Sequence, residues 1–401
     1  MTTPPGDRPL DLVLFGATGF VGNLTADRLG ARLPVGARWA LAGRREDKLR
    51  RTRDRIVAAN PGAPVPELIR ADAADRDALR NLAERARVVI TTVGPYLEYG
   101  EPLVAACAAA GTDYLDLCGE PEFIDRMYLA HHATAVRTGA RIVHSCGFDS
   151  MPHDLGVLFT VGHLPEAVPL AVRGVVRGNF TISGGTFHSA LGQFSRPRQR
   201  RRALDERREV EPGPAGRRVR ARAEPPHRDP DLGVWLLPMP TVDPLVVARS
   251  AAARPDYGPD FTYSHYAGLA HRASMVGAIV GAAVLIGAAR VPPLRRLIGA
   301  GIPRGHGPSE SRRARSWFTV DFIGEGDGRR VHTRVSGGDP GYTDTATMLS
   351  EAGICLAFDE NPPTAGQVTT ATAMGEQLLR RLMDAGISFG VVGGSEPDHA
   401  G

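Results

Sequence analysis

Lysine is almost absent from this 401-residue sequence. Lys48 is the single lysine, so arginine supplies nearly all of the 48 basic residues. Schiff-base chemistry at a central lysine is therefore excluded. Short-chain dehydrogenases pair a tyrosine with a lysine four residues further along a helix, and Lys48 has no tyrosine at that spacing. That mechanism is excluded as well.

Cysteine is also scarce, and its four copies follow no metal-binding or redox motif. The sequence has no CxxC pair and no histidine at zinc-ligand spacing, which indicates reduced thiols in a cytosolic setting and no bound metal. Residues 1–9 are polar and rich in proline, without the apolar core of an export signal. The cysteines are Cys107, Cys118, Cys146 and Cys355.

Charge of one sign is not in large excess. The formal net charge of +4 and the isoelectric point near 9.0 are mild, so we expect no nucleic-acid partner. A hydrophobic content of 42% with 23% charged residues is typical of a soluble globular protein, and the length suffices for two domains.

A glycine-rich turn near the N-terminus carries the clearest functional signal. Leu10–Phe15 is a short apolar run typical of a strand, and Leu24–Leu33 has helical periodicity. Three glycines at a spacing of three lie between them, as in turns that hold a dinucleotide pyrophosphate at a helix N-terminus. An ordinary α/β turn is the alternative. The cofactor-binding residues predicted here are Gly16, Thr18, Gly19, Phe20 and Gly22.

The residues after the second predicted strand, Arg38–Ala42, indicate which dinucleotide binds. An NAD enzyme usually has an acidic residue there to bond the ribose 2′-hydroxyl, whereas this chain has Arg44 and Arg45. Two guanidinium groups favour a 2′-phosphate and hence NADPH, although they could simply be surface residues. Asp72, which ends the third predicted strand, is expected near the adenine.

Strand and helix patterns alternate regularly up to about Pro165. The fourth, fifth and sixth strands are predicted at Val88–Val93, Asp113–Leu117 and Arg141–His144, each followed by a helix. This alternation predicts a doubly wound parallel sheet of the Rossmann type, an α/β fold. Gly94 and Pro95, which end the fourth strand, complete the predicted cofactor-binding set.

Taken together, six motifs resemble the saccharopine dehydrogenase-like oxidoreductases, and within them the trans-acting enoyl reductases of actinobacterial lipid and polyketide pathways. The resemblance implies a Rossmann domain at 1–164, an inserted mixed α/β domain at 165–337, and C-terminal helices at 338–401 that return to the first domain. It does not specify the substrate. The motifs are Val13–Gly22, Ala42–Arg44, Val93–Tyr96, Tyr114–Glu120, Cys146–Asp154 and Gly338–Tyr342.

Candidate catalytic residues follow the ends of the fourth, fifth and sixth strands, where such sheets bind ligands. Tyr96 is the first candidate as proton donor, and its alternative role is a ring packed under the cofactor. Asp149 could bond the substrate or cap the next helix, and Cys146 could equally be a small buried thiol. Cys118 and Glu120 are expected at the same edge of the sheet. His153 is more typical of a structural residue than of a catalytic one.

The second half of the chain carries most of the uncharged segments. Val234–Leu237 and Phe261–Tyr266 are predicted to line an apolar acceptor pocket. Ala273–Ala289 has no charged residue over its length but is short and rich in glycine and alanine for a membrane span. It is predicted to be a core helix, or to meet a membrane surface or a substrate channel beside Arg290, Arg295 and Arg296.

These observations favour an NADPH-dependent reductase acting on a carbon–carbon double bond in a lipid or polyketide intermediate. A saccharopine dehydrogenase-type amino-acid oxidoreductase and a non-catalytic dinucleotide- and lipid-binding protein are the alternatives. We expect a hydrophobic substrate presented by an acyl carrier protein or a membrane surface, and a homodimer stays open. Arg196–Arg228 is predicted to be a solvated, partly mobile loop or helix pair, and its basic part, Arg196–Arg222, could bind either an acidic carrier protein or lipid headgroups. A cytoplasmic location, peripheral to the inner face of the plasma membrane, is expected.

Overall fold

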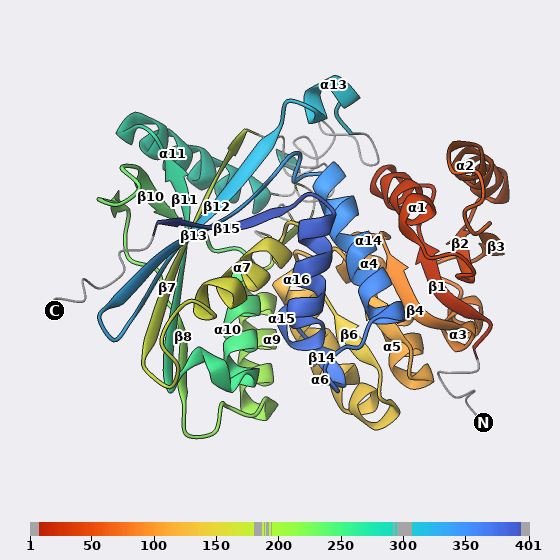
Figure 1. Cartoon of the computed structure of the whole chain (residues 1–401), viewed down its shortest axis with the longest axis horizontal. Helices are drawn as coiled ribbons and strands as arrows, with labels where there is room; N and C mark the ends of the chain where they lie inside the picture. Colours follow the sequence, from red (N-terminus) through yellow and green to blue (C-terminus); the bar gives the residue numbers. More distant parts are fainter. Residues whose placement is uncertain are drawn as a thin grey trace, which may run out of the picture.

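The computed structural model describes residues 8–179, 187, 189, 192–193, 195–291, 293–294 and 307–393 (Figure 1). Arg295 and Arg296 fall outside these residues. The chain forms two sheets, one of seven strands and one of eight. Helices pack around and between them.

The first sheet is built from the N-terminal alternation of strands and helices. Its strand β1 is completely buried, as expected for a central parallel strand covered on both faces. In chain order the elements are β1 (Leu10–Phe15), α1 (Phe20–Arg32), β2 (Trp39–Gly43), α2 (Glu46–Ala59), β3 (Glu67–Arg70), α3 (Arg76–Arg85), β4 (Ala86–Thr91), α4 (Tyr96–Tyr99), α5 (Glu101–Ala110), β5 (Asp113–Leu115), α6 (Pro121–Thr138), β6 (Arg141–Val143) and α7 (Met151–Val161).

The strand order of this sheet confirms the predicted doubly wound fold. The order is β14-β6-β5-β4-β1-β2-β3, and every neighbouring pair is parallel. The direction of winding reverses between β1 and β4. In open α/β sheets, ligands bind outside the carboxyl ends of the strands at this reversal, so the site is expected beside the β1 and β4 loops.

The second sheet is mixed, as the resemblance implied. Its order is β15-β13-β12-β7-β11-β10-β9, with β8 paired to β11. Strands β12 and β13 form an antiparallel pair in this sheet. The strands are β7 (Leu170–Asn179), β8 (Arg218–Ala221), β9 (His227–Arg228), β10 (Trp235–Pro238), β11 (Asp260–Leu269), β12 (Trp317–Gly326), β13 (Arg329–Gly337) and β15 (Ser388–Gly393), and the helices between them include α9 (Pro197–Val210), α10 (Asp243–Ala253), α11 (Arg272–Ala289) and α13 (Glu310–Arg313).

One prediction for this region is wrong. Arg196–Arg228 was expected to be a loop or helix pair, but it contains one helix, α9, and the strands β8 and β9. In the segments expected to line an apolar pocket, Leu236 and Phe261 are fully buried and Tyr266 is nearly so, and the pocket stays a prediction. β10 and β11 pair with each other inside the sheet, which uses their apolar side chains for packing.

The C-terminal segment joins the two sheets. Helix α14 (Thr343–Phe358) packs against α1 and β4, which confirms that C-terminal helices return to the first domain. Strand β14 (Gly366–Val368) extends the first sheet beside β6, and α15 (Thr370–Ala373) and α16 (Gly375–Asp384) follow. Strand β15 then pairs with β13 in the second sheet. Neither strand was predicted.

Candidate active site

The turn between β1 and α1 can only be made by glycine at two positions. Gly16 has a φ of +90°, a conformation that L side chains rarely adopt. A Cβ at Gly22 would lie 2.1 Å from the carbonyl oxygen of Gly16, whereas a Cβ at Gly19 would lie at an ordinary 3.5 Å from the same atom. Close backbone approach at Gly22 holds the start of α1 tightly against β1.

The N-terminus of α1 is open to an anion. Gly19 is the N-cap residue, and among the described residues no side chain caps the helix. The first turn also has no acidic residue. Free backbone N–H groups and the positive end of the helix dipole therefore face the turn, which is the arrangement that binds a pyrophosphate. Thr18 lies in this turn beside Gly43.

Phe20, the first residue of α1, is contacted by a remote part of the chain. Its ring meets the ring of Tyr342 edge-on at 5.0 Å, and the guanidinium of Arg313 lies 5.7 Å from its centroid. A Cβ at Gly307 would lie 2.3 Å from the same ring, so the backbone there passes close to it. Residues before β12 and at the start of α14 therefore lie over the cofactor turn.

The arginines after β2 are exposed and nearly free of partners. The Arg44 side chain is 75% exposed, and its Nε atom lies 3.9 Å from an Asp72 carboxylate oxygen, which is too long for a hydrogen bond. Arg45 is the N-cap residue of α2. Both guanidinium groups are thus positioned at the carboxyl end of β2, where an adenosine ribose would lie in this fold. Asp72 stands at the neighbouring end of β3.

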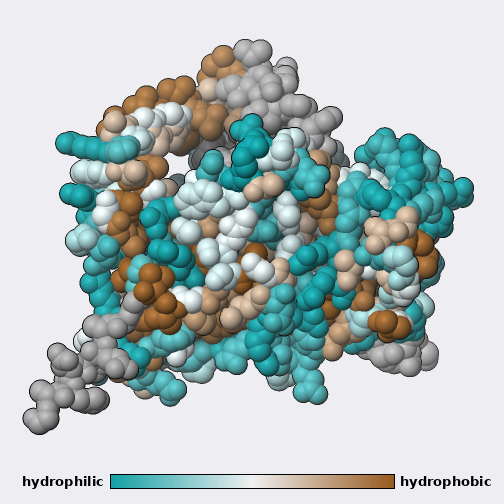
Figure 2. Space-filling view, turned by 45° about the horizontal axis from the view of Figure 1, so that its top comes forward, coloured by the Kyte–Doolittle hydropathy of each residue, from teal (hydrophilic) through white to brown (hydrophobic). Residues whose placement is uncertain are grey.

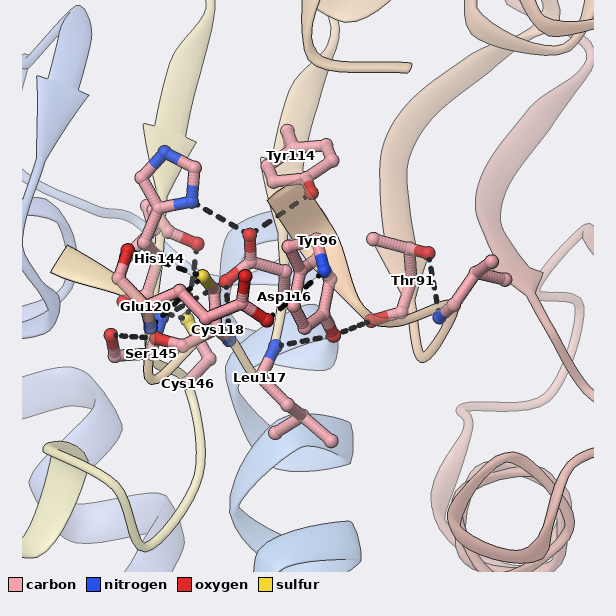
Figure 3. Close-up of polar contacts among 12 residues, drawn as sticks. Thr91, Tyr96, Tyr114, Asp116, Leu117, Cys118, Glu120, His144, Ser145 and Cys146 are labelled. Carbon is pink, nitrogen blue, oxygen red and sulfur yellow. Dashed lines mark hydrogen bonds and ion pairs between the residues drawn. The ribbon is translucent and has the colours of Figure 1, made fainter. Parts of the chain in front are cut away.

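The loop after β4 is braced by a buried carboxylate that the sequence did not single out for this role. The backbone N–H groups of Tyr96 and Leu97 donate to the two Glu120 oxygens at 3.1 and 3.0 Å (Figure 3). Glu120 is only 1% exposed. Because these N–H groups begin the short helix α4, the Glu120 carboxylate acts as its cap. Gly94 and Pro95 are held in place just before it.

Tyr96 itself is buried against the core. Its hydroxyl donates to the Thr91 carbonyl at 3.3 Å and accepts from the Leu117 N–H at 3.1 Å (Figure 3). Burial, together with the nearby Asp116 carboxylate, raises the pKa of Tyr96 well above its usual value. The hydroxyl therefore ties two loops of the sheet edge together.

Asp116 is the centre of the polar network in Figure 3. It is fully buried and accepts from the Tyr114 hydroxyl at 3.0 Å and from the Cys118 and Ser145 N–H groups at 2.9 and 3.0 Å. The His144 Nδ1 atom lies 2.6 Å from its second oxygen. Asp116 therefore joins the loops after β5 and β6 into one rigid edge. A strand-end aspartate in an apolar run is the signal that could have identified it.

Cys146 lies at the same edge of the sheet, but its surroundings disfavour the reactive thiolate form. The residue is fully buried, and its thiol donates to the Val143 carbonyl with a sulfur–oxygen distance of 3.4 Å. Burial raises the pKa of Cys146 well above its usual value. The thiolate that nucleophilic chemistry needs is therefore disfavoured, and the small-buried-thiol alternative fits the geometry. All four cysteines are free and buried.

Asp149 has a different environment from the other candidates. It lies partly buried in the loop after β6, where a Cβ on Gly119 would approach its carboxyl carbon at 3.6 Å. Burial and the negative charge of Asp243 raise the pKa of Asp149 to about 7, although His153 lowers it in part. A carboxyl group that holds its proton near neutral pH can act as a general acid.

Known proteins match this chain from end to end. Residues 12–143 match the saccharopine dehydrogenase NADP binding domain. A protein named putative trans-acting enoyl reductase from Mycobacterium tuberculosis is 40% identical over 97% of this chain and 98% of its own length. A trans-acting enoyl reductase from Mycobacterium leprae is 36% identical over 96% and 98%. This chain belongs to the trans-acting enoyl reductase family, within the saccharopine dehydrogenase-like oxidoreductases.

A solved structure shows the same fold. The apo saccharopine dehydrogenase (L-Glu forming) of Saccharomyces cerevisiae aligns over 95% of this chain and 99% of its own, with a TM-score of 0.55 at 12% identity. The protein is an NADPH-dependent oxidoreductase, as its NADP-binding domain and its family show. The residues present fit this cofactor, because the uncapped α1 N-terminus, the glycine cradle and two exposed arginines provide sites for its pyrophosphate and its 2′-phosphate.

We expect the double substitution Arg44→Ala and Arg45→Ala to weaken NADPH binding at least about tenfold and to leave NADH binding nearly unchanged. Each charge-assisted hydrogen bond to a phosphate contributes about 1.5–3 kcal/mol to binding. NADH has no 2′-phosphate, so the substitutions remove no such hydrogen bond from its complex. Titration calorimetry with both cofactors measures the effect. Arg53→Ala with Arg55→Ala, a pair further along α2, is the matched control. Unchanged NADPH affinity in the first variant would contradict this assignment.

Three buried side chains, His153, Asp243 and His265, form a cluster that the sequence analysis did not predict. His153 Nδ1 lies 2.8 Å from one Asp243 oxygen, and His265 Nε2 lies 3.8 Å from the other. The Tyr263 hydroxyl is 3.0 Å from His265 Nδ1. The three residues come from α7, α10 and β11, so no local spacing connects them.

The charges of this cluster set the environment of Asp149. Burial alone would raise the pKa of Asp243, but the two histidines lower it to about 2, so it is ionised. Burial lowers the pKa of His265 to about 4, which keeps that ring neutral. Ligand atoms of the three side chains lie within 4.8 Å of one another, so they are the described residues that could hold a metal ion. The sequence-based expectation of no metal stays a prediction.

Proposed function

We propose that the protein reduces an activated carbon–carbon double bond in a lipid or polyketide intermediate. The full-length relatives are named trans-acting enoyl reductases, which supports this reaction class. The observation that carries the proposal is the pairing of an NADPH cradle with Asp149, a carboxyl group whose raised pKa, about 7, lets it supply a proton at the same sheet edge. Reduction of an enoyl group requires one hydride and one proton.

The chain's own residues divide the work as follows. When bound, NADPH would supply the hydride that the β-carbon of the enoyl group accepts. The α1 N-terminus would hold the pyrophosphate of the cofactor, and Arg44 would hold its 2′-phosphate. Asp149 delivers its proton to the α-carbon and regains one from water. The anionic Asp243 favours the protonated form of Asp149, so that it is reloaded at neutral pH.

Tyr96 and Cys146 take supporting roles in this proposal. The Tyr96 hydroxyl is engaged with two backbone groups, so it would have to leave both before it donated a proton. Cys146 is fully buried in the segment between β6 and α7 that also carries Asp149. Tyr96 stays the second candidate donor, because only a kinetic comparison with Asp149 separates the two.

The substrate reaches this site from a presenting partner. An acyl carrier protein would dock through basic side chains, and helix α9 is rich in arginine. Several of these arginines already pair with acids, as Arg201 does with Asp205 and Arg202 with Glu206. These pairs leave α9 less free to bind an acidic carrier than its sequence suggests. We therefore propose that a lipid surface, rather than an acyl carrier protein, presents the substrate. A sedimentation measurement tests whether the chain forms a homodimer.

A substrate comparison tests the proposed reaction. We expect NADPH oxidation with a long-chain 2-enoyl thioester and none with saccharopine or related dicarboxylic amino acids. The assay follows NADPH absorbance and identifies the saturated product by mass spectrometry. Turnover of the amino acids alone would establish the saccharopine dehydrogenase alternative. NADPH binding without turnover of either class would favour the non-catalytic alternative.

A further inference from the structure

Helix α11 is apolar and stands out from the body of the protein. It carries no charged residue between Ala273 and Ala289, and among its side chains only Met275 and Ala289 are buried. Figure 2 shows a hydrophobic ridge at this end of the molecule. The most exposed large side chains are Val276 at 50%, Val280 at 57% and Val284 at 66%. An exposed apolar surface of this kind marks an interaction site.

Positions further round the helix are open as well, while Met275 and Ala289 mark the side that packs on the protein. At Gly277, Gly281 and Gly287, an added Cβ would meet none of the described atoms within 4 Å. A protein groove takes an amphipathic helix by one face and leaves a polar back in water. This helix has no polar back, so a groove would leave apolar surface exposed. A lipid phase can cover an apolar helix from several sides at once.

The connections of α11 show how it can enter lipid. Strand β11 precedes it and β12 follows it in the chain, and both strands belong to the same sheet. The chain leaves α11 at Ala289 and reaches β12 at Trp317, so after a crossing the arginine-rich residues between them would have to cross the bilayer back, which is costly. By length and composition α11 is still the one helix among the described residues that could span a membrane. An orientation in the membrane plane satisfies both facts.

The flanks of α11 are basic. Between residues 270 and 316 the sequence has a single acidic residue, Glu310. Arg272 and Arg290, which flank the apolar stretch, are both exposed. Clusters of arginine beside an apolar helix suit anionic lipid headgroups. The arginines of this segment are Arg272, Arg290, Arg295, Arg296, Arg304, Arg312, Arg313 and Arg315.

We propose that α11 docks the protein on an anionic lipid surface, with the helix lying in the plane of the headgroup–acyl boundary. This deepens the proposed function and rests on it in one respect, the hydrophobic substrate that the docked enzyme would meet. The residues that follow α11 connect it to the cofactor turn, because the backbone at Gly307 and the Arg313 side chain contact Phe20. Docking and cofactor binding therefore involve adjoining parts of the chain.

Flotation of the full chain with lipid vesicles tests the proposal. We expect binding to phosphatidylcholine vesicles that contain phosphatidylglycerol, and weaker binding to phosphatidylcholine alone. The double variant Val280→Asp, Val284→Asp should lose at least about tenfold in partitioning, because it places charge in the apolar boundary. The matched control is the double variant Val35→Asp, Val57→Asp, which changes two exposed valines outside α11. It should bind to the vesicles like the wild-type protein.

A fluorescent label reports the depth of the helix. All four native cysteines are buried, so an exposed Ala283→Cys can be labelled selectively with an environment-sensitive dye. We expect its emission to shift to the blue with anionic vesicles. No flotation, an unshifted label, or unchanged binding of the Val280→Asp, Val284→Asp variant would overturn the proposal.

Two further measurements separate this proposal from its alternatives. A dimer that forms without lipid and is broken by Val280→Asp would show that a second copy covers the helix, which also overturns lipid docking. Calorimetry with NADPH and turnover of a short, water-soluble enoyl thioester are measured on the same variants. Retained turnover with lost vesicle binding supports docking as a separate function, whereas vesicle binding without any enoyl turnover refutes the proposed reaction alone.

Discussion

Replacing Asp149 with asparagine is expected to lower kcat by about 10²–10⁴ while NADPH binds with nearly unchanged affinity. Proton delivery by a positioned side chain contributes this much to a rate, and the amide is not an acid. Steady-state kinetics with an enoyl thioester and calorimetry with NADPH measure the two quantities. Tyr96→Phe should reduce kcat by clearly less. If it reduces kcat as much, and Asp149→Asn does not, Tyr96 is the donor.

The pH dependence of kcat gives an independent check on Asp149. Its folded-state pKa, about 7, is raised above the ordinary value, so the protonated acid is present below about pH 7 and is lost as the pH rises. We expect kcat to decline above neutrality. Asp243→Asn removes the negative charge that raises this pKa, and should move the decline to lower pH. A profile that is the same in both proteins would contradict the role of Asp149.

Replacing Gly22 with alanine is expected to weaken NADPH binding about 10–100-fold. The new methyl group would overlap the Gly16 carbonyl oxygen at 2.1 Å, and the backbone would have to move at the pyrophosphate cradle. Gly19→Ala is the matched control, because its methyl group would meet the same oxygen at 3.5 Å. Calorimetry and thermal unfolding are measured on both variants.

The comparison between the two glycines decides the interpretation. Equal weakening by both substitutions would show that the turn tolerates no side chain for reasons other than the close approach at Gly22. Unchanged NADPH affinity in Gly22→Ala would show that the backbone adjusts without cost, and the proposed cradle would then be wrong. A loss of folding in Gly22→Ala alone would show as a lowered melting temperature in the absence of cofactor.

The cofactor turn could be predicted from the sequence because its constraints are local. The spacing of Gly16, Gly19 and Gly22 follows from one turn and the helix after it, and Arg44 follows one strand later. The parallel sheet could be predicted for the same reason, since each strand and helix has its own periodicity. The strand order then follows from the known topology of such folds.

Most of the candidate site at the carboxyl ends of the strands depends on contacts between residues that are far apart in the sequence. Asp116 looks like part of an apolar strand, and its role appears only when the loops after β5 and β6 meet. Asp149 acquires its raised pKa from burial and from Asp243, which lies 94 positions further along the chain. His153 was read as structural, and nothing nearby in sequence shows that Asp243 and His265 surround it.

Apolar segments were the least predictable feature. Phe261–Tyr266 and Ala273–Ala289 both lack charge, yet the first is buried in the second sheet and the second is exposed on α11. Composition alone cannot distinguish an apolar segment that packs in the core from one that lies exposed on the surface.

Transfer of deuterium from labelled NADPH tests the central claim most directly. The enzyme is incubated with NADPH deuterated at C4 of the nicotinamide and with a long-chain 2-enoyl thioester, and the product is analysed by mass spectrometry and NMR. We predict a saturated thioester with deuterium at the β-carbon and a solvent proton at the α-carbon. Deuterium on a carbonyl or imine carbon of another substrate, with the enoyl thioester unchanged, would contradict it.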